Sequence, residues 1–360
     1  MITRDLTLPE IKAFLKSGAL MGLGLENCLV ALGELRRSAK PSGRSVEFYV
    51  PDFFLEDERP WLTFAEVVVA KRDRLVGQLS EIANQPHLDL RWRDPEFSEF
   101  QKKFESVQQA IAKNEIQKAV PVTFSHATGT LTAAMRANMI AHLLREAKKP
   151  TPYGFWTPEE GILGATPEIL FSYDKREGAL ETMALAGTRA SALEAHASLV
   201  NDPKEMFEHD LVIKGLKEKL GSFGEPQVSP TYVWDLGVIS HLRTDISVEF
   251  ANPPASENFF SEMCMLLHPT AALGVAPNGA DWRFLKKCDG TQKRFRFGAP
   301  FGLLNPAGKS VVLVAIRNIQ WLEDQLILGA GCGIVEQSRL ENEWHELEMK
   351  RRSVRAMLGI

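Results

Sequence analysis

The stretch KSVVLVAIRNIQWLEDQLILGAGCGIV, residues 309–335, constrains the fold more than any other part of this sequence. It contains two long segments rich in β-branched and aliphatic residues, separated by the polar pair Glu323 and Asp324. This pattern predicts an antiparallel hairpin of two long strands with its turn at that pair. Further segments with the composition of strands are residues 43–50, 59–70, 117–127 and 161–173, the last of which indicates a strand, a turn and a second strand.

Helical segments lie between these strands. The sequence indicates helices near residues 7–20, 95–116, 259–267 and 340–352. Residues 202–221 carry the most complete set of helix signals, because Asp202 can cap the start, Pro203 suits the first position and Gly221 can end the helix. Since helices and strands are mixed without regular βαβ alternation, we expect an α+β fold built on antiparallel sheets.

The composition excludes several classes of function. The chain has 360 residues and a net charge of −4, with no basic run, so we expect no nucleic-acid partner. No apolar segment is long enough to cross a membrane, and the N-terminal residues show no secretory signal, which predicts a cytoplasmic protein. The four cysteines are scattered without C-x-x-C spacing, so we expect reduced thiols and no zinc site.

Charged residues gather on one stripe of the last predicted helix. At about 100° per residue, Glu343, Glu346 and Lys350 share a face. Glu341 and Glu348 point in another direction and are expected to face solvent. Glu343, Glu346 and Lys350 are therefore candidates for a functional site.

Glu208, on the capped helix described above, is a further candidate. Leu211 and Val212 lie one turn on, and a carboxylate that faces the same way as core residues is costly unless it is paired. Two helices that each offer an inward glutamate could clamp one hard divalent cation, for which Mg²⁺ is the natural candidate. The alternative is that these glutamates are solvated and pair with Lys350 or Arg351, and spacing alone favours that alternative.

A series of short motifs occurs in order along the chain: QKAVPV, GATPEIL, LAGTR, KEMFEHDLV, LLHPTAALG, FGAPFG, VAIRN, GCGIV and EWHELEMKRR. In this order they resemble the chorismate-utilising enzymes, which comprise isochorismate synthase, salicylate synthase and the large subunits of anthranilate and aminodeoxychorismate synthase. The resemblance covers roughly residues 95–358. It implies one large domain of two stacked antiparallel sheets flanked by helices, with residues 96–360 as the catalytic region and residues 1–95 as an N-terminal part of the same domain.

The resemblance also implies a magnesium-dependent site for chorismate. Glu208 and Glu346 would bind Mg²⁺ with support from Glu343, and the metal would hold the ring carboxylate of chorismate. Arg317 and Lys350 would bind carboxylates, which suits a guanidinium fork and an ammonium group. The other positions implied to line the substrate site are Gly187, Thr188, His241, Leu273 and Gly331.

Three positions separate the branches that the resemblance covers. In the isochorismate and salicylate branches, a lysine at the position of Lys118 activates the water that attacks C2 of the ring. A glutamic acid at the position of Glu168 protonates the leaving C4 hydroxyl. Ala186 stands where the aminodeoxychorismate branch has a lysine nucleophile, so that branch is disfavoured. By residue type alone, Lys118 could instead be a solvated strand lysine and Glu168 a surface turn acid.

We therefore predict a Mg²⁺-dependent isochorismate synthase without an obligatory glutaminase partner. Salicylate synthase uses the same acid–base pair and is the nearest alternative. An anthranilate synthase large subunit follows, and then a non-catalytic homologue that binds an anionic metabolite. The residues do not separate menaquinone from siderophore biosynthesis. Met206 and Cys332 depart from the family pattern without removing a predicted catalytic group.

Overall fold

Strands make up most of the framework of the chain. The computed structural model describes residues 3–83, 90–191, 198–250, 258–290 and 293–360. The strands are β1 (Gly18–Leu23), β2 (Asn27–Ser38), β3 (Glu47–Tyr49), β4 (Trp61–Lys71), β5 (Lys118–Ala119), β6 (Val122–Thr128), β7 (Thr151–Trp156), β8 (Glu160–Thr166), β9 (Ile169–Asp174), β10 (Ala179–Ala190), β11 (Gln227–Val228), β12 (Tyr232–Asp235), β13 (Ile239–Glu249), β14 (Val275–Ala276), β15 (Pro300–Leu304), β16 (Ser310–Val314), β17 (Asn318–Leu322) and β18 (Gln325–Gly331). The helices are α1 (Leu8–Lys16), α2 (Arg72–Ile82), α3 (Phe97–Ala112), α4 (Ala133–Glu146), α6 (Pro203–Leu220), α7 (Phe259–Leu267), α8 (Phe284–Asp289) and α9 (Leu340–Leu358).

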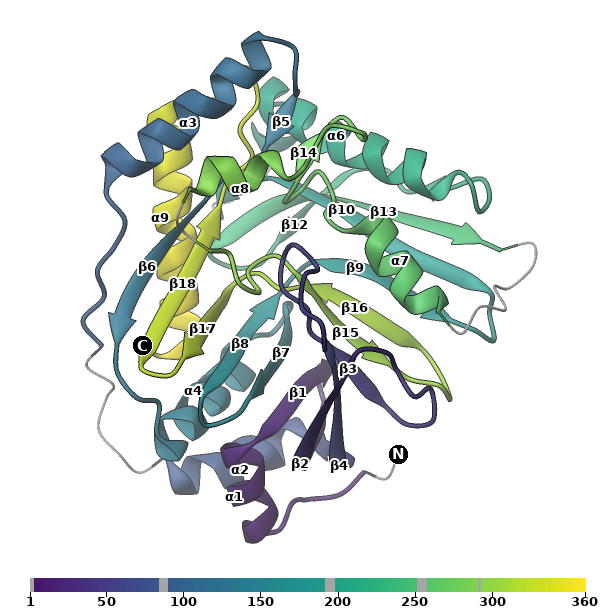
Figure 1. Cartoon of the computed structure of the whole chain (residues 1–360), viewed down its shortest axis with the longest axis vertical. Helices are drawn as coiled ribbons and strands as arrows, with labels where there is room; N and C mark the ends of the chain where they lie inside the picture. The colour runs from purple at the N-terminus through teal and green to yellow at the C-terminus, as the bar shows by residue number, and fades with distance from the viewer. Residues whose placement is uncertain (1–2, 84–89, 192–197, 251–257, 291–292) are drawn as a thin grey trace.

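Most of these strands join in one 16-stranded sheet (Figure 1). Its order is β11-β13-β10-β9-β16-β15-β3-β4-β2-β1-β7-β8-β17-β18-β6, with β12 also paired to β13. The paired strands run antiparallel, and β5 and β14 form a separate two-stranded sheet. The predicted α+β class with antiparallel strands is confirmed. The sheet count differs, because the two stacked sheets that were expected are one continuous hydrogen-bonded sheet.

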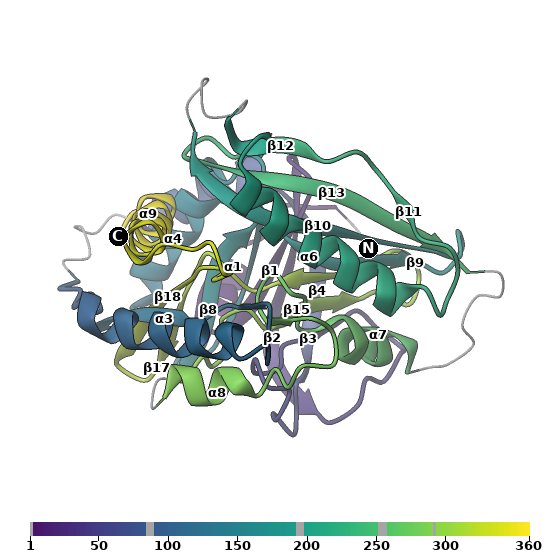
Figure 2. The same cartoon turned by 90° about the horizontal axis from the view of Figure 1, so that it is seen from above.

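Short ladders let this single sheet fold back on itself. β9 pairs with β10 only between Ala179 and Glu181, whereas β13 pairs with β10 along its whole length, from Ala179 to Ala190. Beyond the short ladder, β10 leaves β9, and with β12 and β13 it forms a layer over the other strands (Figure 2). The layers therefore stack as in a sandwich while remaining connected by hydrogen bonds.

The N-terminal segment supplies the middle of the sheet. β1 to β4 lie between β15 and β7, so residues 18–71 share one sheet with strands from the rest of the chain. Along β2, Cys28 and Val30 face one hydrophobic core while Leu29 and Ala31 face another. This alternation follows from the two-residue repeat of a strand, and burial of both faces explains why β2 is apolar throughout its first half.

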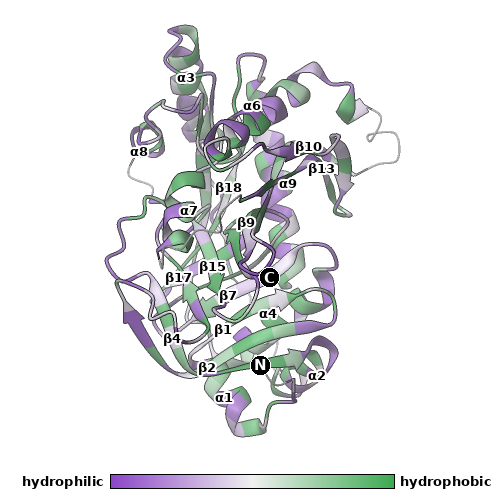
Figure 3. Ribbon diagram, turned by 90° about the vertical axis from the view of Figure 1, so that its right-hand side faces the viewer, coloured by the Kyte–Doolittle hydropathy of each residue, from purple (hydrophilic) through white to green (hydrophobic). Residues whose placement is uncertain are grey.

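Helices cover the outer faces of the sheet. α1, α2, α4 and the end of α9 pack on β1, β2, β8 and β17 around one core, and α3, α8 and α9 share another. Figure 3 shows interior strands coloured mainly hydrophobic, whereas the outer helices α6 and α8 carry hydrophilic residues. Among the described residues, no helix combines the length and the apolar character that crossing a membrane requires.

The prediction of a two-stranded hairpin over residues 309–335 is wrong for the first strand. The turn at Glu323 and Asp324 is confirmed, but the first arm is two strands, β16 and β17, separated at Arg317. β16 pairs with β15 and β9, whereas β17 pairs with β8 and β18. Arg317 has a φ of +56°, in the left-handed region, which turns the chain out of one ladder and into the other. Arg317 therefore stands between strands and not within one.

Pro121 divides the strand predicted over residues 117–127. Proline offers no N–H to a ladder, and the two pieces pair with different partners. β5, which begins at Lys118, pairs with β14, and β6, which begins at Val122, pairs with β18.

The signals predicted for the helix at 202–221 are confirmed in α6. Asp202 Oδ1 accepts hydrogen bonds from the backbone N–H groups of Lys204 at 2.9 Å and Glu205 at 3.2 Å. Pro203 occupies the first position and Gly221 is the C-cap.

We predict that Gly161→Ala destabilises the fold. A Cβ at this position in β8 would lie 2.2 Å from Trp321 Cζ2, inside a packed core. Overpacking of this kind lowers the free energy of unfolding by about 1–3 kcal/mol. Gly77→Ala is the control, because Gly77 lies in α2 with no atom within 4 Å of its added Cβ. It should raise that free energy by about 0.5–1 kcal/mol. Urea unfolding of both variants measures the difference, and equal stabilities would contradict the prediction.

Candidate active site

One cavity is lined by residues of β10, β13, β18 and α9, among other elements. All but two of the site residues predicted from the sequence line it: Glu168, Gly187, Thr188, Glu208, His241, Leu273, Arg317, Gly331, Glu346 and Lys350. The two exceptions lie just behind its wall, since Lys118 contacts Glu208 and Glu343 contacts Lys204. The tertiary structure thus gathers residues that are scattered over more than 200 positions of the chain.

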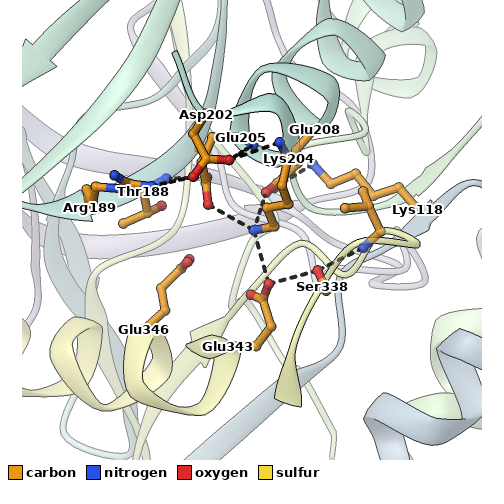
Figure 4. A network of polar contacts seen from close by, with 12 residues as sticks. Lys118, Thr188, Arg189, Asp202, Lys204, Glu205, Glu208, Ser338, Glu343 and Glu346 are labelled. Carbon is orange, nitrogen blue, oxygen red and sulfur yellow. Dashed lines mark hydrogen bonds and ion pairs between the residues drawn. The ribbon is translucent and has the colours of Figure 1, made fainter. Parts of the chain in front are cut away.

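A cluster of buried charges joins α6 to α9 (Figure 4). Lys204 Nζ lies 3.1 Å from Glu205 Oε1 and 3.3 Å from Glu208 Oε2, both on α6. It also lies 3.0 Å from Glu343 Oε1 on α9. Because Lys204 precedes Glu208 by four residues, the two side chains share one face of α6. A single ammonium group therefore links carboxylates from both helices.

Lys118 completes this cluster from the opposite side of Glu208. Its side chain is fully buried, and its Nζ lies 3.0 Å from Glu208 Oε1. Gly333 makes room for the pair, since a Cβ there would lie 2.0 Å from Glu208 Oε1 and 2.7 Å from Lys118 Cε. The reading of Lys118 as a solvated strand lysine is therefore wrong.

The balance of charges sets the protonation of these carboxyls. Burial raises the pKa of Glu205 and of Glu343 to about 7, although Lys204 opposes the rise in both. Burial also opposes ionisation of Glu208, but Lys118 and Lys204 together outweigh it and lower the pKa of that carboxyl. At Lys204 the surrounding carboxylates outweigh burial and hold the ammonium pKa well above its usual range. Lys204 therefore stays charged.

The donor set fits a hard divalent cation. Four carboxyl groups, those of Glu205, Glu208, Glu343 and Glu346, line the cavity or the cleft beside it, and oxygen donors are what Mg²⁺ prefers. Glu343 Oε2 is buried without a hydrogen-bond partner. Within the described ranges, no three acidic, histidine or cysteine side chains already surround one point that could hold a metal. Glu205, Glu208 and Glu343 contact the Lys204 ammonium, whereas Glu346 pairs with Lys350.

Glu168 lies in the turn between β8 and β9. Its backbone N–H donates to Thr166 Oγ1 at 3.1 Å, and its carbonyl accepts from the Val314 N–H at 3.0 Å. The side chain is buried, so the reading of Glu168 as a surface turn acid is wrong. Burial raises the pKa of its carboxyl to about 8, with Lys118 and Lys350 opposing the rise. The carboxyl is therefore mostly protonated at neutral pH.

Cations occupy a second region of the cavity wall. Lys350 Nζ pairs with Glu346 at 2.6 Å and donates to the Gly331 carbonyl at 2.8 Å. The pairing of Glu346 with Lys350 was one alternative from the sequence, but Glu346 is buried at the cavity and not on a solvated surface. Arg317 Nη2 lies 2.9 Å from His241 Nε2. Burial lowers the pKa of Arg317 to about 10, so its guanidinium remains charged at neutral pH.

Several residues of the site were missed by the sequence analysis. Lys204 and Glu205 lie in the motif KEMFEHDLV, and the i,i+4 spacing of Lys204 and Glu208 could have indicated their pairing. The sequence does not identify Gly333 as a site residue, because its role depends on the close approach of Glu208 to Lys118. The apolar wall was also missed and consists of Leu185, Ala272, Phe297, Ile316 and Ala330, together with Ala186, which was singled out only for its missing lysine.

The departures Met206 and Cys332 do not line the cavity. Cys332 is buried and packs in the core shared by α3, α8 and α9, and all four cysteines are buried and unpaired.

Known proteins resemble this chain in sequence and in fold. The family model described as "Chorismate binding enzyme" matches residues 45–359. The chain is 30% identical over 206 residues to the salicylate biosynthesis isochorismate synthase of Pseudomonas aeruginosa, covering 55% of this chain and 42% of that protein. It is 29% identical over 225 residues to isochorismate synthase EntC of Escherichia coli K12, covering 59% and 56%. The matches thus span about half the length of these curated relatives.

The fold is similar over nearly the whole chain to a solved structure. Superposition on MenF, the menaquinone-specific isochorismate synthase from Escherichia coli, gives a TM-score of 0.77 at 20% identity. It covers 99% of this chain and 93% of the other. At 20% identity this likeness establishes the fold alone. Membership of the family rests on the family model that matches residues 45–359. The chain belongs to the chorismate-binding enzyme family.

Proposed function

We propose that the protein is a Mg²⁺-dependent isochorismate synthase. The observation that carries the proposal is the buried Glu168 carboxyl, which lines the same cavity as Arg317, Glu208 of α6 and Glu346 of α9. Burial raises the pKa of this carboxyl. Conversion of chorismate to isochorismate needs an acid at the leaving C4 hydroxyl and positive charge around two carboxylates. The names of the two curated relatives support the same activity.

The charged groups of the cavity suit a dianionic substrate. The Arg317 guanidinium can bind a carboxylate through two parallel N–H donors, and the Lys350 ammonium adds a second positive charge. Glu208 and Glu346, supported by Glu343, would hold the Mg²⁺. When bound, that ion supplies the positive charge for the ring carboxylate. Mg²⁺ binding between these carboxylates requires the Lys204 ammonium to move away from them.

The acid and the base occupy different surroundings. Glu168 lines the cavity and can hold a proton at neutral pH for transfer to the leaving hydroxyl. Lys118 is the proposed base for the attacking water and lies one side chain behind the wall, in contact with Glu208.

Salicylate synthase is the second candidate, because elimination of pyruvate from isochorismate would use the same acid–base pair. Ala186 lines the cavity and offers no amine, so no covalent adduct through that position is proposed.

The test is to incubate the purified chain with chorismate and Mg²⁺, with and without ammonium, and to separate the products by chromatography. We expect isochorismate alone, lost on addition of EDTA. Salicylate with pyruvate would support the second candidate, and anthranilate formed only with ammonium would refute the role of Lys118 in water attack. Lys118→Gln is the matched variant. It should form no isochorismate and still bind chorismate, since Lys118 does not line the cavity.

We predict that kcat/KM falls as pH rises through about 8. Burial raises the pKa of Glu168 to about 8, so the carboxyl carries its proton below this pH and loses it above. A general acid is lost with that proton, and the rate should fall about tenfold for each further pH unit. Initial rates at saturating Mg²⁺ across this range measure the effect. Glu168→Gln should be inactive at every pH, and a flat wild-type profile up to pH values well above 8 would contradict the assignment.

We also predict that Lys204→Met binds Mg²⁺ about tenfold more tightly than the natural chain. The ammonium competes with a cation for Glu205, Glu208 and Glu343, and its removal leaves their charges unbalanced. The metal-free variant should also unfold at a lower temperature and recover with added Mg²⁺. Titration calorimetry and thermal unfolding in MgCl₂ measure both effects. Glu208→Ala is the opposite control and should lose Mg²⁺ binding, while weaker binding by Lys204→Met would count against competition.

A further inference from the structure

Both ring nitrogens of His241 are engaged by protein groups. Nδ1 lies 3.1 Å from the Gly187 carbonyl and 3.2 Å from Thr188 Oγ1. Nε2 lies 2.9 Å from Arg317 Nη2. The side chain is buried at 6% exposure, so solvent cannot replace these partners freely.

These partners specify one tautomer of the imidazole. A guanidinium can only donate, so Nε2 must accept and carry no hydrogen. A carbonyl can only accept, so Nδ1 must carry the hydrogen that points at Gly187. The two contacts, assigned independently, agree on a neutral ring with hydrogen on Nδ1.

The backbone on both sides is shaped for this contact. The β10–β13 register shifts between Ala186 and Thr188, and Gly187 within this bulge has a φ of +75°. A bulge re-aims the groups of its strand, and here the Gly187 carbonyl meets the imidazole. Arg317 has the left-handed φ of +56° described above, an uncommon conformation for a residue other than glycine.

Arg317 has little else to hold its guanidinium. Apart from His241, its side chain has one long contact, from Nη1 to Ser353 Oγ at 3.4 Å. No carboxylate oxygen lies within ion-pair distance of Arg317 among the described residues, although Glu346 is near enough to favour its charged form. The remaining N–H donors are therefore available to a substrate.

We propose that His241 is a positioning residue that orients the Arg317 guanidinium toward the substrate carboxylate. Its role is to accept one N–H of Arg317 while Gly187 fixes the ring. This refines the expectation that His241 binds substrate, since neither nitrogen is left to do so. The proposal rests on the proposed function for the identity of the carboxylate but not for the geometry.

The electrostatic surroundings support a ring that stays neutral. Burial, together with the charges of Arg317 and Lys350, holds the pKa of His241 well below its usual range. A protonated ring would place a second cation against Arg317 and would remove the acceptor on Nε2. The His241 ring must therefore be neutral in order to accept the hydrogen bond from Arg317.

The first test needs no substrate. Long-range ¹H–¹⁵N correlation spectra of the full chain report which ring nitrogen carries hydrogen, and His241→Gln assigns the signal. We expect a neutral Nδ1–H ring at neutral pH, with a changed Nε2 shift in Arg317→Met. A ring with hydrogen on Nε2, or an Nε2 signal indifferent to Arg317→Met, would overturn the proposal whatever reaction the protein catalyses.

The second test is a double-mutant cycle on chorismate turnover. Glutamine places its carbonyl oxygen near the position of Nε2, whereas asparagine ends short of it. His241→Asn should therefore raise KM about tenfold with little change in kcat, and His241→Gln should raise it less. In an Arg317→Met background, His241→Asn should have no further effect on KM. Equal effects in both backgrounds would show that His241 acts without Arg317.

Failure of the proposed function is distinguishable from failure of this inference. A chain that forms no product from chorismate refutes the proposed function, and the spectra then still decide the orientation of His241. A chain that turns over chorismate with uncoupled effects at His241 and Arg317 refutes the inference alone.

Discussion

The site depends on one contact, the Lys204 ammonium held between carboxylates of α6 and α9. α6 follows β10, near one end of the hydrogen-bonded order, and α9 follows β18, near the other. Because the sheet folds back on itself, these distant elements meet across a single cavity. Burial of so many charges is costly unless each has a partner, and the alternation of lysines with glutamates provides those partners. Apolar residues would pack the same space at lower cost, so packing alone does not account for this cluster of charges.

The cavity divides into regions of different chemistry. Glu208, paired with Lys118 and Lys204, lines one part of the wall, Arg317 and Lys350 also line it, and apolar side chains such as Phe297 and Ile316 complete it. The proposed dianionic substrate would place its carboxylates against the cations and its ring against the apolar side chains. Glu168 lines the same cavity, where burial raises the pKa of its carboxyl. Arg317 and Gly187, which both line the cavity, have positive φ values.

Sequence patterns were most informative where local rules decide the structure. The caps of α6, the turn at Glu323 and Asp324, and the shared helix face of Glu343 and Glu346 follow from signals within a few residues of one another. The burial of these two glutamates does not, since their spacing alone favoured solvated side chains. The predicted strands were wrong where the chain changes partners, at Arg317 and at Pro121. A run of apolar residues does not reveal which ladder each half joins. The ordered motifs identified the family, and the resemblance named residues that the cavity then brought together.

By itself the sequence determined the residue types of the site, the helices that carry its glutamates and the antiparallel α+β class. Only the tertiary structure decided that Lys204 pairs with glutamates of both α6 and α9, that Lys118 contacts Glu208, and that His241 contacts Arg317. The physical reason is distance along the chain. Propensity and capping act over one or two turns, whereas an ion pair or a fixed tautomer depends on side chains that meet only after the sheet has closed on itself.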